Sequence, residues 1–354
     1  MIKTVGVCGY GSTGSSAVVD LLHEFDETQI FIYEFSIAHR QNGLEDLEYF
    51  LKKYRNLKVV KQFIKFVMNY QFLTPYGKKR IINISEISVS KELDDFLNRI
   101  LSNSHGYNCK SCIDAYSSKS NYIKRIIRKM LRMCRINTNI YSKFNLDVVR
   151  NDFDDAAKLF VLDILNVFGI NYNLDEKEIV VLNQPFQAYD PVKSFKFFEN
   201  PRAVIVSRDP RDHYLFNKYF LSQRVPFSVA PKNVNDYIRH FRYNCIPSQN
   251  LRERKDIMFL NFEELVYDCD NTTKKVTDFL GITKHTHKGE YFKPTHSRNN
   301  TQLFKKYAGC EDDIKKIEKE LSEYIFPFDN YPDIEPEGGM FYDCQIFKKT
   351  GKML

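Results

Sequence analysis

A short stretch rich in glycine and hydroxyl groups, GYGSTGSS at residues 9–16, is the part of the chain whose composition most directly suggests chemistry. It follows the apolar run TVGVC at 4–8 and precedes AVVDLL at 17–22, which has the apolar spacing of a helix. A strand, a glycine-rich turn and a helix form the layout of a loop that binds phosphate through backbone N–H groups. Its two outer glycines keep the GxxxxG spacing, but Ser15 stands where a nucleoside triphosphatase has lysine. The loop therefore predicts an anion site that lacks the cation required by a γ-phosphate.

Polar residues directly follow three further runs that predict strands. Glu34, Gln184 and Arg208 each come at or just beyond the end of such a run. In parallel α/β sheets, ligands bind beyond the carboxyl ends of the strands. We therefore expect these side chains and the glycine-rich loop to gather at one edge of a sheet. These three runs are 29–33, 178–182 and 203–206. A further strand, which no such residue follows, is predicted at 257–260.

The order of the elements predicts an α/β fold with a parallel central sheet flanked by helices. Apolar residues at three- and four-residue spacing predict helices at 209–222, 231–248 and 262–281, between and after the strands. Strands that alternate with helices are typical of parallel sheets. The long block at 43–170 is mostly helical in pattern and predicts a large insertion on one domain that spans 1–354. The tail at about 327–354 contains prolines and paired glycines and is expected to be irregular.

The composition restricts the class of ligand and the location. The net charge is +7, from 52 basic and 45 acidic residues, which favours anionic ligands but is too mild to indicate nucleic acid. No run approaches the roughly 18 apolar residues of a membrane span. A strand close to the N-terminus leaves no room for a signal peptide, so a cytoplasmic protein is expected. The scattered cysteines contain one CxxC pair, Cys109 and Cys112, which predicts reduced thiols and no metal site.

A basic amphipathic segment, KSNYIKRIIRKMLRMCR at 119–135, interleaves seven Lys and Arg residues with an apolar stripe. One interpretation is a solvated helix of the insertion that packs its isoleucines on the core. The other is a helix that lies on an anionic membrane surface or borders a groove for an anionic glycan. The sequence leaves both interpretations open.

Three separated segments, taken in order, resemble the sulfotransferases that use 3′-phosphoadenosine 5′-phosphosulfate (PAPS), in particular bacterial carbohydrate sulfotransferases. GSTGSS at 11–16 is similar to the family's 5′-phosphosulfate loop, [RK]-S-G-T-T. VIVSRDPRD at 204–212 resembles the strand and R-x-P-R-D turn that hold the 3′-phosphate. SRNNTQLFKKY at 297–307 is similar to the closing segment S-x-x-N-x-x-x-W-K-x-Y. Between them, FLNFEEL at 259–265 and FLGI at 279–282 resemble the family's YEDL and FLGI stretches.

The resemblance implies a P-loop-like sulfotransferase fold and transfer of a sulfuryl group from PAPS, without a metal, to a hydroxyl. The acceptor would be a saccharide, a lipid-linked saccharide or another small hydroxylated molecule, and the product of the donor would be 3′-phosphoadenosine 5′-phosphate (PAP). Nucleic acid is not an expected partner. By the same resemblance, the residues that hold the donor are Gly11, Ser12, Thr13, Gly14, Ser15, Ser16, Arg208, Ser297, Arg298 and Asn299.

Two positions depart from the family's pattern. Ser12 replaces the basic residue of the loop, and Phe216 replaces the serine that contacts the 3′-phosphate. Arg40 or Arg298 could replace the missing charge, or the donor site is weakened. Two other functions therefore stay open. One is a P-loop kinase of a small molecule, against which the absent loop lysine counts, and the other is a non-catalytic relative that binds nucleotides or glycans.

Sulfuryl transfer requires a base that takes the acceptor's proton. Glu34 at the end of the second strand is the first candidate, and His39 is the second, because many members of the family use histidine. Gln184 is predicted either to bind sulfate or acceptor or to serve as a turn residue. Arg211 and Asp212 are expected to brace their turn as an ion pair.

Overall fold

The computed structural model describes residues 3–54, 57–72, 82–83, 89–100, 152–170, 179–221, 233–247 and 249–338. The chain divides into two compact units, which are described separately. Unit 1 comprises 1–31, 177–191 and 200–354, and unit 2 comprises 32–176 and 192–199. The predicted insertion at 43–170 therefore lies entirely within the range of unit 2, and the extent of the single domain stays a prediction.

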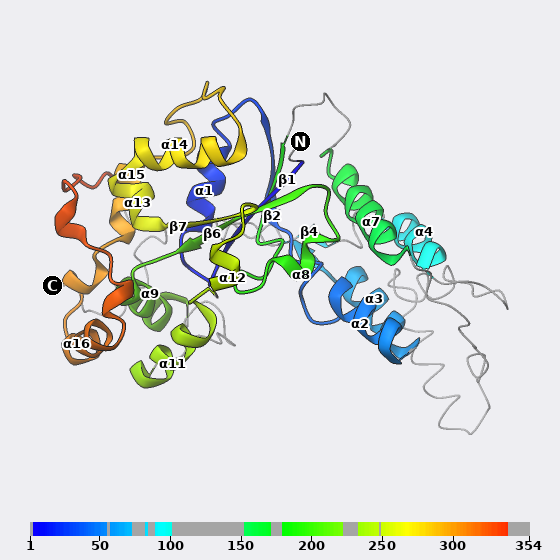
Figure 1. Cartoon of the computed structure of the whole chain (residues 1–354), viewed down its shortest axis with the longest axis horizontal. Helices are drawn as coiled ribbons and strands as arrows, with labels where there is room; N and C mark the ends of the chain where they lie inside the picture. Colours follow the sequence, from blue (N-terminus) through cyan, green and yellow to red (C-terminus); the bar gives the residue numbers. More distant parts are fainter. Residues whose placement is uncertain are drawn as a thin grey trace. The chain divides into compact units, whose positions relative to one another are not determined.

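A five-stranded sheet carries the fold, in the order β2-β5-β1-β6-β7. The pairs β1–β5, β1–β6 and β6–β7 are parallel, and Val5 on β1 lies opposite Val181 of β5. This arrangement confirms the predicted α/β class, a parallel central sheet flanked by helices (Figure 1). Its strands are β1 Thr4–Gly9, β2 Thr28–Glu34, β5 Ile179–Asn183, β6 Pro201–Ser207 and β7 Ile257–Asn261.

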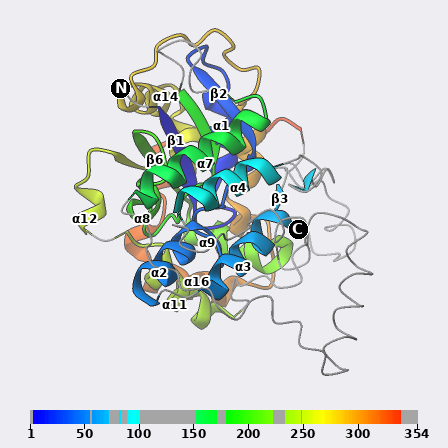
Figure 2. The same cartoon turned by 90° about the vertical axis from the view of Figure 1, so that its right-hand side faces the viewer.

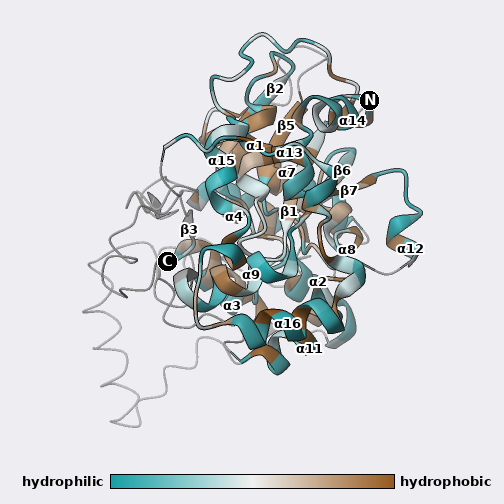
Figure 3. Cartoon of the chain, turned by 90° about the vertical axis from the view of Figure 1, so that its left-hand side faces the viewer, coloured by the Kyte–Doolittle hydropathy of each residue, from teal (hydrophilic) through white to brown (hydrophobic). Residues whose placement is uncertain are grey.

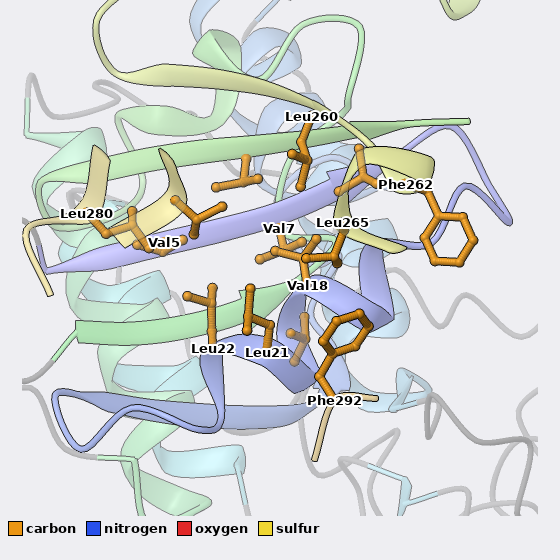
Figure 4. Close-up of a cluster of buried hydrophobic side chains, with 14 of the residues drawn as sticks. Val5, Val7, Val18, Leu21, Leu22, Leu260, Phe262, Leu265, Leu280 and Phe292 are labelled. Carbon is orange, nitrogen blue, oxygen red and sulfur yellow. The ribbon is translucent and has the colours of Figure 1, made fainter. Parts of the chain in front are cut away.

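One face of the sheet packs on three helices of unit 1. Alternate residues of β1, such as Val5 and Val7, point into this core, together with Val18 and Leu22 from α1 and Leu265 from α13 (Figure 4). These side chains are buried, and removing that apolar area from water stabilises the layer at about 25 cal/mol per Å². The helices are α1 Ser15–Leu22, α13 Phe262–Tyr267 and α14 Cys269–Leu280.

A second buried cluster joins the helix after β6 to two later helices. Tyr214 of α9, Tyr237 of α11 and Ile317 of α16 are among its fully buried members. Apolar and polar residues alternate along α11 and α16, as the hydropathy colours in Figure 3 show. The elements of this part are α9 Pro210–Phe216, α11 Val234–Asn244, α12 Gln249–Arg252, α15 Pro294–Ser297 and α16 Glu311–Glu320, with short 3-10 turns at Arg298–Asn300, Leu303–Lys305, Ser322–Tyr324 and Phe328–Asn330.

Two of the predicted helices are not continuous α-helices. The helix expected at 209–222 is α-helical only to Phe216 and then becomes a π-helix, Asn217–Leu221. The helix expected at 262–281 consists of α13 and α14, which are separated at Asp268, whose φ of −132° and ψ of 50° are not helical. The apolar periodicity runs through Asp268, so the sequence pattern did not reveal the break.

Unit 2 is largely helical where the structure describes it, as predicted for 43–170. Helix α4 packs against α7 (Figure 2), and Phe96 and Phe160 stack with ring centroids 4.7 Å apart. The elements of this unit are α2 Leu44–Tyr54, α3 Leu57–Met68, α4 Ser90–Ile100, α7 Phe153–Val167 and α8 Val192–Phe195, with a two-stranded pair of β3 Gln71–Phe72 and β4 Ile82–Asn83. Cys109, Cys112 and the basic segment 119–135 lie outside the described residues.

Neither a membrane span nor a metal cluster occurs in the described part of the chain. Each helix found there is too short or too polar to cross a bilayer. Likewise, no group of three or more His, Cys, Asp or Glu side chains in those ranges is placed to hold a metal ion.

We predict that Gly6→Ala destabilises the protein, although alanine usually suits a strand better than glycine. A Cβ at this position of β1 would lie 2.6 Å from Pro185 Cγ and would also collide with the ring of Phe186. Such overpacking costs about 1–3 kcal/mol. Urea denaturation measures the loss. Gly169→Ala is the control, because a Cβ there meets nothing within 4 Å and adds only the strain of a positive φ. Equal losses in the two variants would contradict the packing argument.

Candidate functional site

The glycine-rich loop after β1 has the backbone conformation of an anion-binding turn. Gly11, Ser12 and Gly14 have φ values of 82°, 58° and 92°, all in the left-handed region. A Cβ on Gly14 would lie 2.7 Å from Phe262 Cγ, so both its φ and its neighbour require glycine. Ser12 occupies a region that costs a non-glycine residue of order 1 kcal/mol, so its surroundings must hold it there.

The backbone N–H groups of the loop are available to a ligand. Within the described residues, none of the N–H groups from Gly11 to Ser16 has a hydrogen-bond acceptor, whereas the N–H of Tyr10 donates to Thr13 Oγ1 at 3.2 Å. Helix α1 begins at Ser15, so its first-turn N–H groups add their partial positive charge at this point. The predicted anion site at 11–16 therefore has the required donors in place.

Gln184 braces this loop from the end of β5. Its Oε1 accepts from the N–H of Gly9 at 3.2 Å, and its Nε2 donates to Ser15 Oγ at 3.0 Å. Gln184 itself has a φ of 56°. Of the two interpretations left open by the sequence, contact with sulfate or acceptor stays a prediction, while the structure gives the side chain a role in holding the loop.

Arg208 approaches the loop from the end of β6. Its Nη1 donates to the carbonyl oxygen of Ser12 at 2.9 Å, and its Nη2 donates to the carbonyl of Asn300. The buried guanidinium also lies 5.0 Å from the ring centroid of Phe216, where an aromatic face attracts the cation but donates no hydrogen bond to a phosphate. Arg208 Nε is buried without a partner. The structure thus brings Arg208 to the predicted loop, as expected from the strand ends.

The predicted ion pair between Arg211 and Asp212 is wrong. Arg211 instead binds Asp209, with Nη2 at 2.8 Å from Oδ2, and also pairs with Glu318. Asp209 caps α9 by accepting the N–H of Arg211 at 2.9 Å and also accepts the N–H of Phe326 at 3.0 Å. Residues 209 and 211 meet because the cap turns the chain back at the helix start, an orientation that the spacing did not reveal.

Asp212 holds the closing segment instead. Its carboxylate accepts the N–H groups of Gln302 and Leu303, each at 2.7 Å. Burial raises the pKa of this carboxyl, while the charge of Arg208 and the N–H donors act in the opposite direction. Glu263 lies beside this cluster and accepts the N–H of Asp209 at 3.0 Å. Its full burial and then the nearby Asp209 and Asp212 raise the pKa of Glu263 to about 8, so it is protonated at neutral pH.

His213 was not singled out from the sequence. Its Nε2 lies 2.8 Å from the carbonyl oxygen of Gly11, and its Nδ1 lies 3.1 Å from the hydroxyl of Tyr237. Burial and then the charge of Arg208 lower the pKa of this imidazole to about 3, so it is neutral. Its position in the helix that follows Arg208 was the available signal, but a lone histidine has no distinctive pattern.

Two of the three predicted donor residues at 297–299 contact the C-terminal part of unit 1. Ser297 ends α15, where its N–H donates to the carbonyl of Lys293. Arg298 donates to Asp333 Oδ1 from Nη2 at 2.9 Å, and Asn299 Nδ2 donates to the carbonyl of Glu337 at 2.9 Å. The charge of Arg298 is therefore paired with Asp333 and is not free to replace the basic residue that the loop lacks at Ser12. Contacts of these three residues with a donor stay a prediction.

The two candidate bases, Glu34 and His39, belong to unit 2. Glu34 ends β2 and is half-buried, and Arg40 Nη2 lies 3.8 Å from its Oε2. Burial raises the pKa of Glu34, while Arg40 acts in the opposite direction. The chain turns back after β2, where the hydroxyl of Tyr70 accepts the N–H of Ser36 at 2.9 Å. His39 is half-buried in this turn. Arg40, the other suggested substitute for a loop cation, pairs with Glu34.

Comparison with known proteins agrees with the resemblance inferred from the sequence. Human sulfotransferase 2A1 is 30% identical over 111 residues, which is 28% of this chain and 39% of that protein. This chain is a relative of the sulfotransferases. The match spans well under half the length of the curated protein, and no family model matches.

Two solved structures are similar in fold to this chain, and each match extends over more than nine tenths of its length. The sulfotransferase domain of the Synechococcus PCC 7002 olefin synthase is 11% identical, with a TM-score of 0.39, and covers 92% of this chain and 95% of its own. Sulfotransferase STF9 from Mycobacterium avium is 13% identical, with a TM-score of 0.40, and covers 95% of this chain and 78% of its own.

We predict that Glu263→Gln makes this sulfotransferase relative less sensitive to alkaline pH. The folded pKa of Glu263, about 8, lies above its ordinary value of 4.5, so its contribution to stability is complete below pH 4.5 and is lost as pH rises through 8. Glutamine keeps the oxygen that accepts from Asp209 and cannot ionise. Urea denaturation between pH 6.5 and 8 should show a shallower decline for the variant.

The decline of stability with pH that remains in the variant comes from Asp212, because the pKa of its carboxyl is also raised. His213 does not contribute in this range, because its lowered pKa costs stability only as pH falls below 6.5. Identical slopes for wild type and Glu263→Gln would show that Glu263 is ionised in the folded protein.

Proposed function

We propose that this chain is a PAPS-dependent sulfotransferase that moves the sulfuryl group to a hydroxyl of a saccharide or another small hydroxylated acceptor. The observation that supports it best is the row of N–H groups at 11–16 without acceptors, in a relative of the sulfotransferases. Backbone N–H groups suit a phosphosulfate, which carries fewer negative charges than a triphosphate. The loop has no lysine to contact a γ-phosphate, and this supports sulfuryl transfer over phosphoryl transfer.

In the proposed reaction, the acceptor oxygen forms a bond to sulfur while the bond between sulfur and the bridging oxygen of the 5′-phosphate breaks. The acceptor's proton passes to Glu34, with His39 as the alternative base, and PAP leaves. A base is more effective when its pKa approaches the working pH, and the raised pKa of Glu34 is in that direction. Developing negative charge on the leaving phosphate is stabilised by the loop's N–H groups, which are oriented before the reaction begins.

The remaining parts of the proposal follow from the resemblance. Arg208 and the segment 297–299 are the proposed contacts of the 3′-phosphate, and the chemistry calls for no metal. A lipid-linked saccharide, membrane contact through 119–135 and a cytoplasmic location stay predictions.

The donor site is tested by calorimetric titration with PAP in the absence of magnesium. We expect micromolar binding by the wild type and at least a tenfold loss, about 1.4 kcal/mol, for Gly14→Ala, because its Cβ collides with Phe262 and disturbs the loop. Gly281→Ala is the matched control, since it also has a positive φ but open space around it. Binding of ATP with magnesium in place of PAP would instead favour the kinase.

The base is tested by turnover of PAPS with a panel of saccharides and other small hydroxylated acceptors. Glu34→Gln keeps the size of the side chain but cannot accept the proton, so we expect kcat to fall about 10²–10⁴-fold while PAP affinity is unchanged. His39→Asn is the parallel variant. A large loss of kcat in His39→Asn with none in Glu34→Gln would assign the base to His39. Retained PAP binding without turnover on any acceptor would indicate a non-catalytic relative.

A further inference from the structure

We propose that Arg208 and His213 together replace the basic residue that the loop lacks at Ser12, by holding the loop's carbonyls and placing a buried charge behind them. Arg208 lies in the turn that joins β6 to α9 and His213 lies in α9 itself, and each binds a different loop carbonyl. This inference rests on the proposed function, because it concerns how the same loop binds the 5′-phosphosulfate.

The charge of Arg208 is directed at the loop. Within the described residues, no carboxylate lies within 4 Å of its guanidinium, in contrast with Arg211 and Arg298, which are both paired. Nη1 donates to the Ser12 carbonyl at 2.9 Å, and aromatic rings of Phe216 and Phe262 lie 5.0 and 5.7 Å from the guanidinium carbon. Only 6% of Arg208 is exposed. Little water therefore screens the positive charge from an anion on the loop.

His213 supplies a neutral hydrogen bond to the neighbouring carbonyl. A carbonyl oxygen only accepts, so Nε2 carries the proton that bonds Gly11 at 2.8 Å. Since the imidazole is neutral, Nδ1 is an acceptor 3.1 Å from the Tyr237 hydroxyl, whose single proton is shared between Nδ1 and the carbonyl of Pro210 at 2.9 Å. The ring is 1% exposed and is fixed from both sides.

Because the peptide group is planar, these two contacts also fix the directions of the neighbouring N–H groups. In a trans peptide, the carbonyl of one residue and the N–H of the next point in opposite directions. Holding the Gly11 carbonyl toward His213 therefore turns the Ser12 N–H away from it, and holding the Ser12 carbonyl toward Arg208 does the same for the N–H of Thr13. These are two of the N–H groups that lack acceptors. The same contacts stabilise Ser12 at its φ of 58°.

Two ligands distinguish this role from recognition of the 3′-phosphate. PAP carries both phosphates, whereas adenosine 5′-phosphosulfate carries the 5′-phosphosulfate and no 3′-phosphate. Calorimetric titration of both ligands into the full chain, without magnesium, compares wild type with variants of the two residues. We expect Arg208→Ala to weaken both ligands at least tenfold, about 1.4 kcal/mol, with the larger loss for PAP, because only PAP also loses the proposed contact of its 3′-phosphate. Arg208→Lys retains a charge but not the two-carbonyl geometry and should lie between wild type and alanine.

The histidine is tested with two replacements of different chemistry. His213→Leu removes the donor to Gly11 and should weaken both ligands, whereas His213→Gln can place an N–H near the position of Nε2 and should restore most of the affinity. A purely packing role would not separate the two variants in this order. Arg239→Ala is the control for general loss of charge, because that exposed residue of α11 pairs with the nearby Asp236, and its affinities should equal those of the wild type. Thermal melts confirm that each variant is folded.

Each outcome decides between the two proposals. If Arg208→Ala weakens PAP but leaves adenosine 5′-phosphosulfate unchanged, the arginine serves the 3′-phosphate alone. This inference is then overturned while the proposed function stands. If His213→Leu binds both ligands like the wild type, the histidine has no positioning role. If the wild type binds neither ligand, the proposed function is overturned together with the inference.

Discussion

The turn after β6 is the constraint on which the rest of unit 1 depends. Within six residues it sends side chains to three distant parts of the chain. Arg208 reaches the loop after β1, Asp209 reaches Phe326 near the C-terminal part, and Asp212 reaches the backbone at 302–303. Because β6 is hydrogen-bonded to β1 and β7 on its two sides, the turn has a fixed position. The loop and the closing segment are therefore placed relative to the same short stretch.

Charge compensation decides which groups in this turn are ionised. Burying a charge is costly unless it is paired or hydrogen-bonded. Asp209 meets this condition through Arg211, and Asp212 through the backbone N–H groups it accepts. Glu263 has no basic partner at hydrogen-bond distance in the described residues, and its raised pKa leaves it protonated. Arg208 is then the charge in the turn that is directed to the loop, where an anion would provide its compensation.

The proposed anion-binding loop is held in its conformation by its neighbours more than by its own side chains. Gln184 holds Gly9 and Ser15, and His213 and Arg208 hold two carbonyls in between, those of Gly11 and Ser12. Donors that are fixed before a ligand arrives need no reorganisation when charge develops, which is the basis of electrostatic stabilisation in enzymes. A loop with serine in place of the basic residue retains this property, because the hydrogen-bond donors belong to the backbone.

Local sequence determined the strands, the glycine-rich loop and the gathering of Gln184 and Arg208 at the loop. Short β-branched runs specify buried strands, and parallel strands bring their carboxyl ends to one edge. The break at Asp268 and the π-helix after Phe216 were not predictable, because the apolar spacing continues through both. The partners of Arg211, Asp212 and His213 were decided only by the tertiary structure. Their contacts join residues about 90 to 200 positions apart or depend on how a helix cap turns, and neither is encoded in local spacing.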